Sequence, residues 1–211
     1  MHAGFPCFTQ DLQKVFRLGG QNTHIPQALD LVSGRLLAGG MAMLLKIGFG
    51  YLMRDSLLDE ERSRKSQAFF DENFVFSDSS APDGKSYYQG KFLIRTARPG
   101  DDMNVYFQFC PRPDELYVET VFGRSLNSLA VITTDVLTES EADAVENDPD
   151  KVDLVIRFRD LESILNLVGK EEVDIVGLLL ENVVQLTGNT GHLFKLGAIA
   201  TDIELELGLT Q

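Results

Sequence analysis

Apolar residues recur at helical spacing in the first part of the chain and at every second position in its middle part. The helical stripe follows Pro26 and consists of Leu29, Val32, Leu36, Met43 and Ile47. Proline suits a first helical turn, so this spacing predicts a long helix, with Gly39 and Gly40 as the candidate break. A second, polar helix is predicted over residues 56–67, and residues 1–24 are expected to form an irregular arm with weak helical content.

The alternating segments predict three strands, over residues 88–95, 103–109 and 116–122. Proline, glycine and aspartate gather between them at residues 98–102 and 111–114, which is typical of turns, so the three strands are expected to be antiparallel neighbours. Each strand has one apolar face that another layer must cover.

Further on, residues 153–158 alternate again and predict a fourth strand. Asp160 begins a helix that Gly169 ends, a second apolar helix covers residues 173–180, and residues 183–187 form a short strand. A final apolar helix or extended tail begins at Leu193.

The amino-acid composition argues against several classes of function. The chain has 211 residues with a formal net charge of −13, which argues against a nucleic-acid partner because phosphate recognition uses clustered Lys and Arg. Cys7 and Cys110 form no disulfide framework, and the three histidines have no zinc-ligand spacing, so no metal and no cofactor is expected.

Residues 135–150 are rich in acidic side chains and predict a solvated loop or short helix. Calcium binding is the alternative, but the spacing of an EF-hand loop is missing.

Only one segment approaches the length and apolarity of a membrane span, residues 36–53. Lys46 and four glycines interrupt it, so an amphipathic or buried helix is the preferred interpretation, with contact to a membrane surface left open. No basic and apolar leader begins the chain, and a cytoplasmic location is expected.

Residues 159–170, with the sequence RDLESILNLVGK, resemble the C-terminal signature of the sterol carrier protein type-two family. The order continues in register with an apolar helix, a strand, Gly188-Asn189 and another apolar helix. About 50 residues match closely. Asn182 stands where the family usually has glycine, and asparagine tolerates the left-handed backbone that this turn needs.

The resemblance implies an α/β (α+β) fold, in which a five-stranded mixed sheet is covered on one face by helices around an apolar tunnel. It divides the chain into an N-terminal helical extension, residues 1–70, and a lipid-binding domain, residues 71–211. It also implies non-catalytic binding or transfer of a sterol, fatty acyl chain or isoprenoid. The candidate lipid-binding residues are Phe92, Ile94, Val105, Phe107, Val118, Leu154, Ile156, Leu165, Val176, Leu179, Leu193, Phe194 and Leu196.

The residues themselves leave two hypotheses open, because an apolar face can line a pocket or simply pack as a core. In the first, the protein binds a lipid, and the N-terminal helices cover the tunnel or form a homodimer. In the second, the core is closed and the helix that follows Pro26 docks a partner through an exposed apolar patch. No catalytic motif supports an enzyme. His192 is expected to be a surface histidine, with a helix cap or a ligand headgroup contact as the alternative.

Overall fold

The computed structural model describes residues 5–6, 33–53, 60–81, 84–121, 123–167, 172–173 and 175–206. Its central feature is a five-stranded mixed sheet, in the order β11-β9-β4-β5-β8. The strands of this sheet are β4 (Lys91–Thr96), β5 (Asn104–Phe109), β8 (Ile132–Val136), β9 (Leu154–Phe158) and β11 (Val184–Gly188). β4 and β9 are parallel and the other neighbours are antiparallel. The expected α+β fold with a five-stranded mixed sheet is therefore confirmed.

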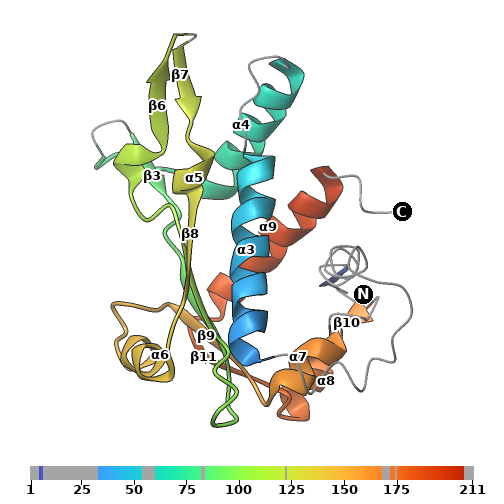
Figure 1. Cartoon of the computed structure of the whole chain (residues 1–211). Coiled ribbons are helices and arrows are strands. Elements are labelled where there is room, and N and C mark those ends of the chain that lie inside the picture. Colours follow the sequence, from blue (N-terminus) through green and yellow to red (C-terminus); the bar gives the residue numbers. More distant parts are fainter. Residues whose placement is uncertain are drawn as a thin grey trace.

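The strand beside β5 in the central sheet is not the one that the alternation predicted, which was residues 116–122. Within the described part of the chain, β6 (Tyr117–Thr120) pairs only with β7 (Gly123–Leu126), in a separate hairpin that projects beyond the end of the sheet (Figure 1). The place beside β5 is taken by β8, which sets Ile132 opposite Phe109 and Val136 opposite Val105. These apolar cross-strand pairs extend the buried face of β5, and β6 was wrongly assigned to it.

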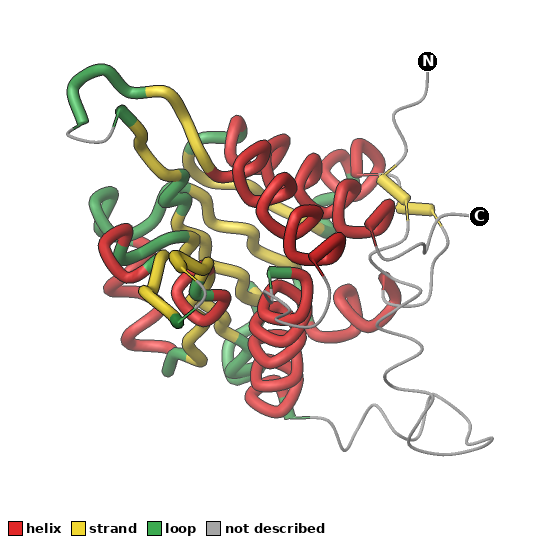
Figure 2. Tube along the Cα trace, turned by 90° about the horizontal axis from the view of Figure 1, so that it is seen from above, coloured by secondary structure: helices red, strands yellow, loops and turns green. Residues whose placement is uncertain are grey.

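Several helices cover one face of the sheet. α3 (Gly34–Leu52) packs on β5 and β8, and α4 (Glu60–Phe74) adds buried phenylalanines beside it. α7 (Leu161–Leu167) packs on β9, and α8 (Ile175–Leu180) packs on β11. α9 (Gly191–Glu206) completes this layer. Figure 2, a view from above, shows most of the helices on one side of the strands.

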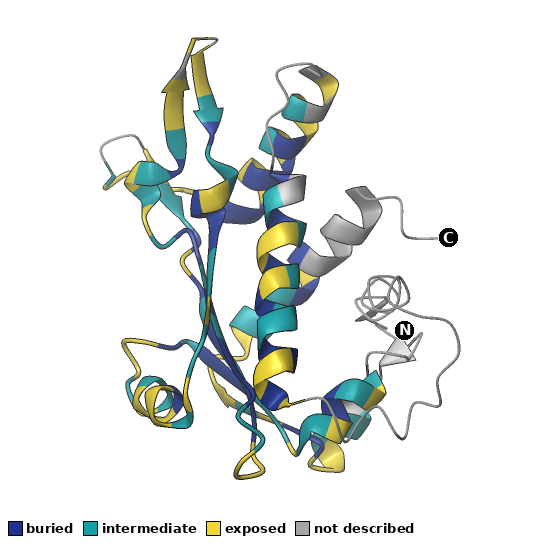
Figure 3. Ribbon diagram, in the orientation of Figure 1, coloured by how far each residue is buried: buried dark blue, intermediate teal, exposed yellow. Residues whose placement is uncertain are grey.

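α3 is one continuous helix, so Gly39 and Gly40 do not break it. Its inner side buries five apolar residues against the sheet, and Figure 3 shows buried and exposed bands alternating along α3. They are Leu37, Ala38, Ala42, Leu45 and Phe49, and Met53 is buried directly after the helix ends. Leu36, Met43 and Ile47 of the predicted stripe lie on the opposite, exposed side. Among the described residues, no helix is long and apolar enough to cross a membrane.

The second face of the sheet also carries a helix, which corrects the expectation of helices on one face only. α6 (Glu139–Glu146) lies within the acidic segment, where a loop or short helix was predicted. Thr138 and Glu141 form a capping box at its start. Its Ala142 packs against Leu93 of β4 and Val155 of β9, so this helix has its own small apolar cluster.

Short elements complete the described chain. They are β1 (Phe5–Pro6), β2 (Val75–Ser77), β3 (Lys85–Tyr87), η1 (Pro113–Glu115), α5 (Ser128–Val131) and β10 (Glu172–Val173). The predicted arm over residues 1–24, apart from β1, and the cap at Gly169 lie outside the described residues. The boundary placed after residue 70 falls within α4, and α3, α4 and the sheet contribute to one hydrophobic core.

Candidate functional site

Most of the candidate residues from the strands meet on the face of the sheet beneath α3, α7, α8 and α9. Five of them are buried there: Phe92, Val105, Phe107, Leu154 and Ile156. Ile94 packs against the same cluster and is partly buried. Alternation along β4, β5 and β9 brings them together, because every second side chain points to one face.

The part of this face beneath α3 is filled by aromatic rings. The rings of Phe92 and Phe107 stack with centroids 4.7 Å apart, and Phe109 packs edge-on against Phe49 of α3 at 5.1 Å. Phe74 of α4 approaches Phe109 at 5.3 Å. Ring contacts of this kind are those of a close-packed core, so Phe92 and Phe107 here contact protein side chains.

The part beneath α7, α8 and α9 is different, because it is mainly aliphatic. Ile164 of α7 and Ile199 of α9 are buried there, whereas a set of leucines is only partly buried. Leu165, Leu179, Leu193 and Leu196 were predicted from the sequence, and Leu161, Leu178 and Leu186 join them. These leucines come from three helices and from β11, and all of them pack against the main core. We call these seven residues the leucine surface.

Two candidate residues lie elsewhere. Val118 is in the β6–β7 hairpin with 44% of its surface exposed, because β8 occupies the place expected for β6. Phe194 is 70% exposed on the side of α9 away from the core. Both placements correct the sequence prediction. Val176 belongs to α8, but its side chain lies outside the described residues.

A tyrosine and a histidine meet beside the leucine surface. The Oη atom of Tyr88 lies 2.7 Å from Nδ1 of His192, and the two rings stack with centroids 5.6 Å apart. His192 is in the first turn of α9, directly before Leu193, and its ring also meets Phe92 at 6.0 Å. The prediction of a plain surface histidine is therefore wrong, since His192 is partly buried against the core.

Gly90 makes room for this pair. A Cβ atom at position 90 would lie 2.5 Å from the Tyr88 hydroxyl and 3.0 Å from the Phe92 ring. The glycine thus lets the Tyr88 side chain fold back toward β4. Burial raises the pKa of Tyr88, and the negative charge of Asp153 raises it further, so the phenol keeps its proton. In the sequence, only the Tyr88-x-Gly90-x-Phe92 alternation marked this position.

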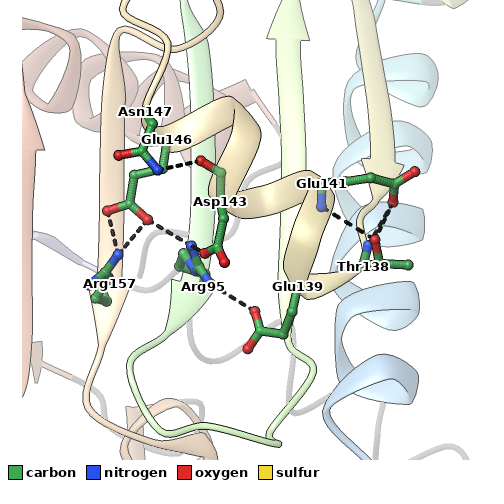
Figure 4. A network of polar contacts seen from close by, with 8 residues as sticks. All are labelled: Arg95, Thr138, Glu139, Glu141, Asp143, Glu146, Asn147 and Arg157. Atoms are coloured by element: carbon green, nitrogen blue, oxygen red, sulfur yellow. Dashed lines mark hydrogen bonds and ion pairs between the residues drawn. The ribbon is translucent and has the colours of Figure 1, made fainter.

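A second polar cluster lies on the other face of the sheet, beneath α6 (Figure 4). The guanidinium of Arg95, whose side chain is 7% exposed, contacts three carboxylates of α6. Its distances are 2.7 Å to Glu139, 2.8 Å to Asp143 and 2.7 Å to Glu146. Glu146 also pairs with Arg157, the neighbour of Arg95 across the β4–β9 ladder. The Glu146 carboxylate therefore contacts both of the neighbouring guanidinium groups, Arg95 and Arg157.

This cluster holds α6 to the sheet. Burial by itself would lower the pKa of Arg95, but its hydrogen bonds to Asp143 and Glu146 and the nearby negative charges raise it, so the guanidinium stays charged. Arg95 Nε and both side-chain polar atoms of the fully buried Asn104 make no hydrogen bond to the described residues. Within the described ranges, no group of three or more acidic, histidine or cysteine side chains could hold a metal ion. We interpret the cluster as structural.

Cys110 is a buried free thiol at the end of β5. Burial raises its pKa to about 12, so it is protonated at neutral pH. A thiol in that state is a poor nucleophile, because the thiolate is the reactive form.

The chain was compared with protein-family models, with curated proteins and with solved structures, and none of the three comparisons found a match.

Proposed function

We propose that this protein binds a lipid, such as a sterol, a fatty acyl chain or an isoprenoid, between the sheet and helices α7, α8 and α9. The observation that carries the proposal is the leucine surface. Six of its side chains come from helices over the sheet and the seventh, Leu186, comes from β11, yet all seven are less buried than the aromatic residues beneath α3. Covering apolar surface stabilises a complex by about 25 cal/mol per Å², so a hydrocarbon chain that contacts these leucines would bind favourably.

Such binding needs no catalytic group. Each buried CH₂ of the ligand contributes about 0.8 kcal/mol, so affinity grows with chain length alone. We accordingly propose a carrier rather than an enzyme. The fold supports this interpretation, since the five-stranded mixed sheet and its layer of helices are what the resemblance to the sterol carrier protein type-two family implies. A cytoplasmic location is part of the same proposal, and cell fractionation tests it.

The first test is native mass spectrometry of the freshly purified protein, followed by organic extraction of any bound molecule. A reproducible adduct of lipid mass supports the proposal. A fluorescent fatty acid and a fluorescent sterol should then bind to the delipidated protein. If no adduct is found and neither probe binds, the carrier function is rejected.

Two adjacent residues of α8 make a matched pair for locating the ligand. Leu179 is partly buried in the leucine surface, whereas Leu180 is 79% exposed. We expect Leu179→Asp to weaken probe binding by tenfold or more, because a carboxylate cannot be desolvated against a hydrocarbon. Leu180→Asp should leave binding unchanged. Equal effects of the two substitutions would place the ligand elsewhere.

One observation favours the second candidate function, docking of a partner chain. Leu36, Met43 and Ile47 form an apolar stripe on the outer side of α3, and each is more than half exposed. If this stripe pairs two copies of the chain, light scattering should give a dimeric mass for the wild type and a monomeric mass for Met43→Asp. A monomeric wild type would exclude self-association through α3.

A further inference from the structure

The Tyr88–His192 pair lies where the leucine surface ends along α9. His192 and Leu193 are consecutive residues, and Leu196 follows one turn later on the same helix. Tyr88 is 9% exposed and His192 is partly buried, so the pair lies at the border between the core and the leucine surface. A lipid lying along α9 would therefore meet these two polar side chains at one end.

The pair can donate a hydrogen bond to a third group in either orientation of its own hydrogen bond. If the Tyr88 hydroxyl donates to Nδ1 of His192, the imidazole carries its proton on Nε2. If Nδ1 donates to the Tyr88 oxygen, the hydroxyl proton of Tyr88 can point to a third group. In both cases one N–H or O–H remains to meet an oxygen atom of a ligand.

The electrostatic surroundings disfavour a negatively charged ligand. The negative charge of Asp153 acts on the Tyr88 phenol and raises its pKa. A tyrosine side chain is neutral or negative and never positive, so Tyr88 cannot offset the charge of a carboxylate. The chain as a whole carries a formal charge of −13, which adds to the repulsion of an anion.

We propose that Tyr88 and His192 hold the polar end of the ligand, and that they select a neutral lipid with a hydroxyl or carbonyl group over a fatty acid. This inference rests on the proposed carrier function. It assigns the leucine surface to the hydrocarbon part of the ligand and the Tyr88–His192 pair to its single polar group. Lys195 lies one turn after His192 on α9. If its ammonium group reached the ligand, its positive charge would favour the carboxylate of a fatty acid over a neutral lipid.

Three ligands of equal chain length test the proposal by displacement of a fluorescent probe: hexadecanol, palmitic acid and hexadecane. We expect hexadecanol to bind the wild type most tightly. Tyr88→Phe, which keeps the ring and removes the hydroxyl, should weaken hexadecanol binding about fivefold or more, the effect of one lost hydrogen bond, and leave hexadecane binding unchanged. Tyr117→Phe is the control, because that hydroxyl contacts Gln67.

A spectroscopic measurement on the wild type covers the case in which a variant does not fold. The ¹⁵N signals of the His192 ring should shift when hexadecanol is added and stay in place with hexadecane. Tighter binding of palmitic acid, lost in Lys195→Met, would overturn the proposed selectivity. Hexadecanol binding that is insensitive to Tyr88→Phe, with no His192 shift, would overturn the assigned polar site. In both outcomes the carrier function stands. If none of the three ligands binds, both proposals fail.

Discussion

Asn182 occupies the left-handed region of backbone conformation, with φ of 54°, in the turn between α8 and β11. Most side chains are strained there by about 1–2 kcal/mol, because Cβ crowds the following carbonyl oxygen. We expect Asn182→Ala to lower the free energy of unfolding by about 1 kcal/mol and Asn182→Gly to leave it nearly unchanged. Urea denaturation measures both. An equal loss in the two variants would show that the Asn182 side chain itself stabilises the turn.

Asp160 begins α7 as the sequence predicted. Its Oδ1 atom accepts hydrogen bonds from the backbone N–H of Ser163, at 2.8 Å, and from the Ser163 hydroxyl, at 2.6 Å. The bond from the Ser163 hydroxyl is the main cause that lowers the pKa of Asp160 below its ordinary value of 3.8. Its contribution to stability is therefore present above about pH 4 and is lost as pH falls through the lowered pKa.

Asp160→Asn keeps a side chain that can cap the helix and removes its negative charge. Asparagine caps helices about as well as aspartate, but it does not titrate. We expect the variant to lose less thermal stability than the wild type between about pH 6 and about pH 3. Parallel pH profiles of Tm for the two proteins would contradict this assignment.

At the scale of elements, α6 is held to the sheet by charge as well as by packing. Glu146 is 16% exposed and contacts both Arg95 and Arg157. Glu146→Ala leaves two neighbouring cations without the carboxylate between them, and we expect it to lower the free energy of unfolding by about 2–3 kcal/mol. Asp143→Ala should cost less, because Asp143 is 63% exposed. Equal costs in chemical denaturation would contradict this ranking.

α3 illustrates why the side of a helix that packs inward depends on its partner. Both of its sides carry apolar residues, but Ala38 is fully buried and Met43 is 63% exposed. We expect Ala38→Asp to lower the free energy of unfolding by several kcal/mol, since it buries an unpaired carboxylate. Met43→Asp should change it by less than about 0.5 kcal/mol. Thermal unfolding of the two variants measures the difference, and comparable losses would mean that both sides of α3 are covered.

At the scale of the whole molecule, the sheet order decides which phenylalanines and valines belong to the core. Phe107 is fully buried between β4 and β8, whereas Val118 lies in the projecting hairpin. We expect Phe107→Ala to cost about 3–5 kcal/mol and Val118→Ser to stay within about 0.5 kcal/mol. Lipid-probe binding should also be unchanged in Val118→Ser. A large loss of stability in Val118→Ser would contradict the exposed position of Val118 and would indicate that β6 belongs to the central sheet.

Much of the local structure followed from the sequence. Alternation located β4, β5 and β9, and the segments around Asp160 and Asn182 have the predicted cap and turn. β8 was missed, although Ile132, Thr134 and Val136 alternate as a strand should. Its partner β5 lies more than 20 residues away, across a hairpin, and alternation does not identify partners.

The sequence by itself determined what depends on near neighbours along the chain: the periods of helices and strands, the caps and the turns, because backbone geometry and short-range hydrogen bonds act over a few residues. Only the tertiary structure decided which strand lies beside β5, that α6 covers the second face, and that Tyr88 meets His192 from 104 positions away. Those arrangements depend on apolar burial and on paired charges, which act between any segments that the fold brings into contact.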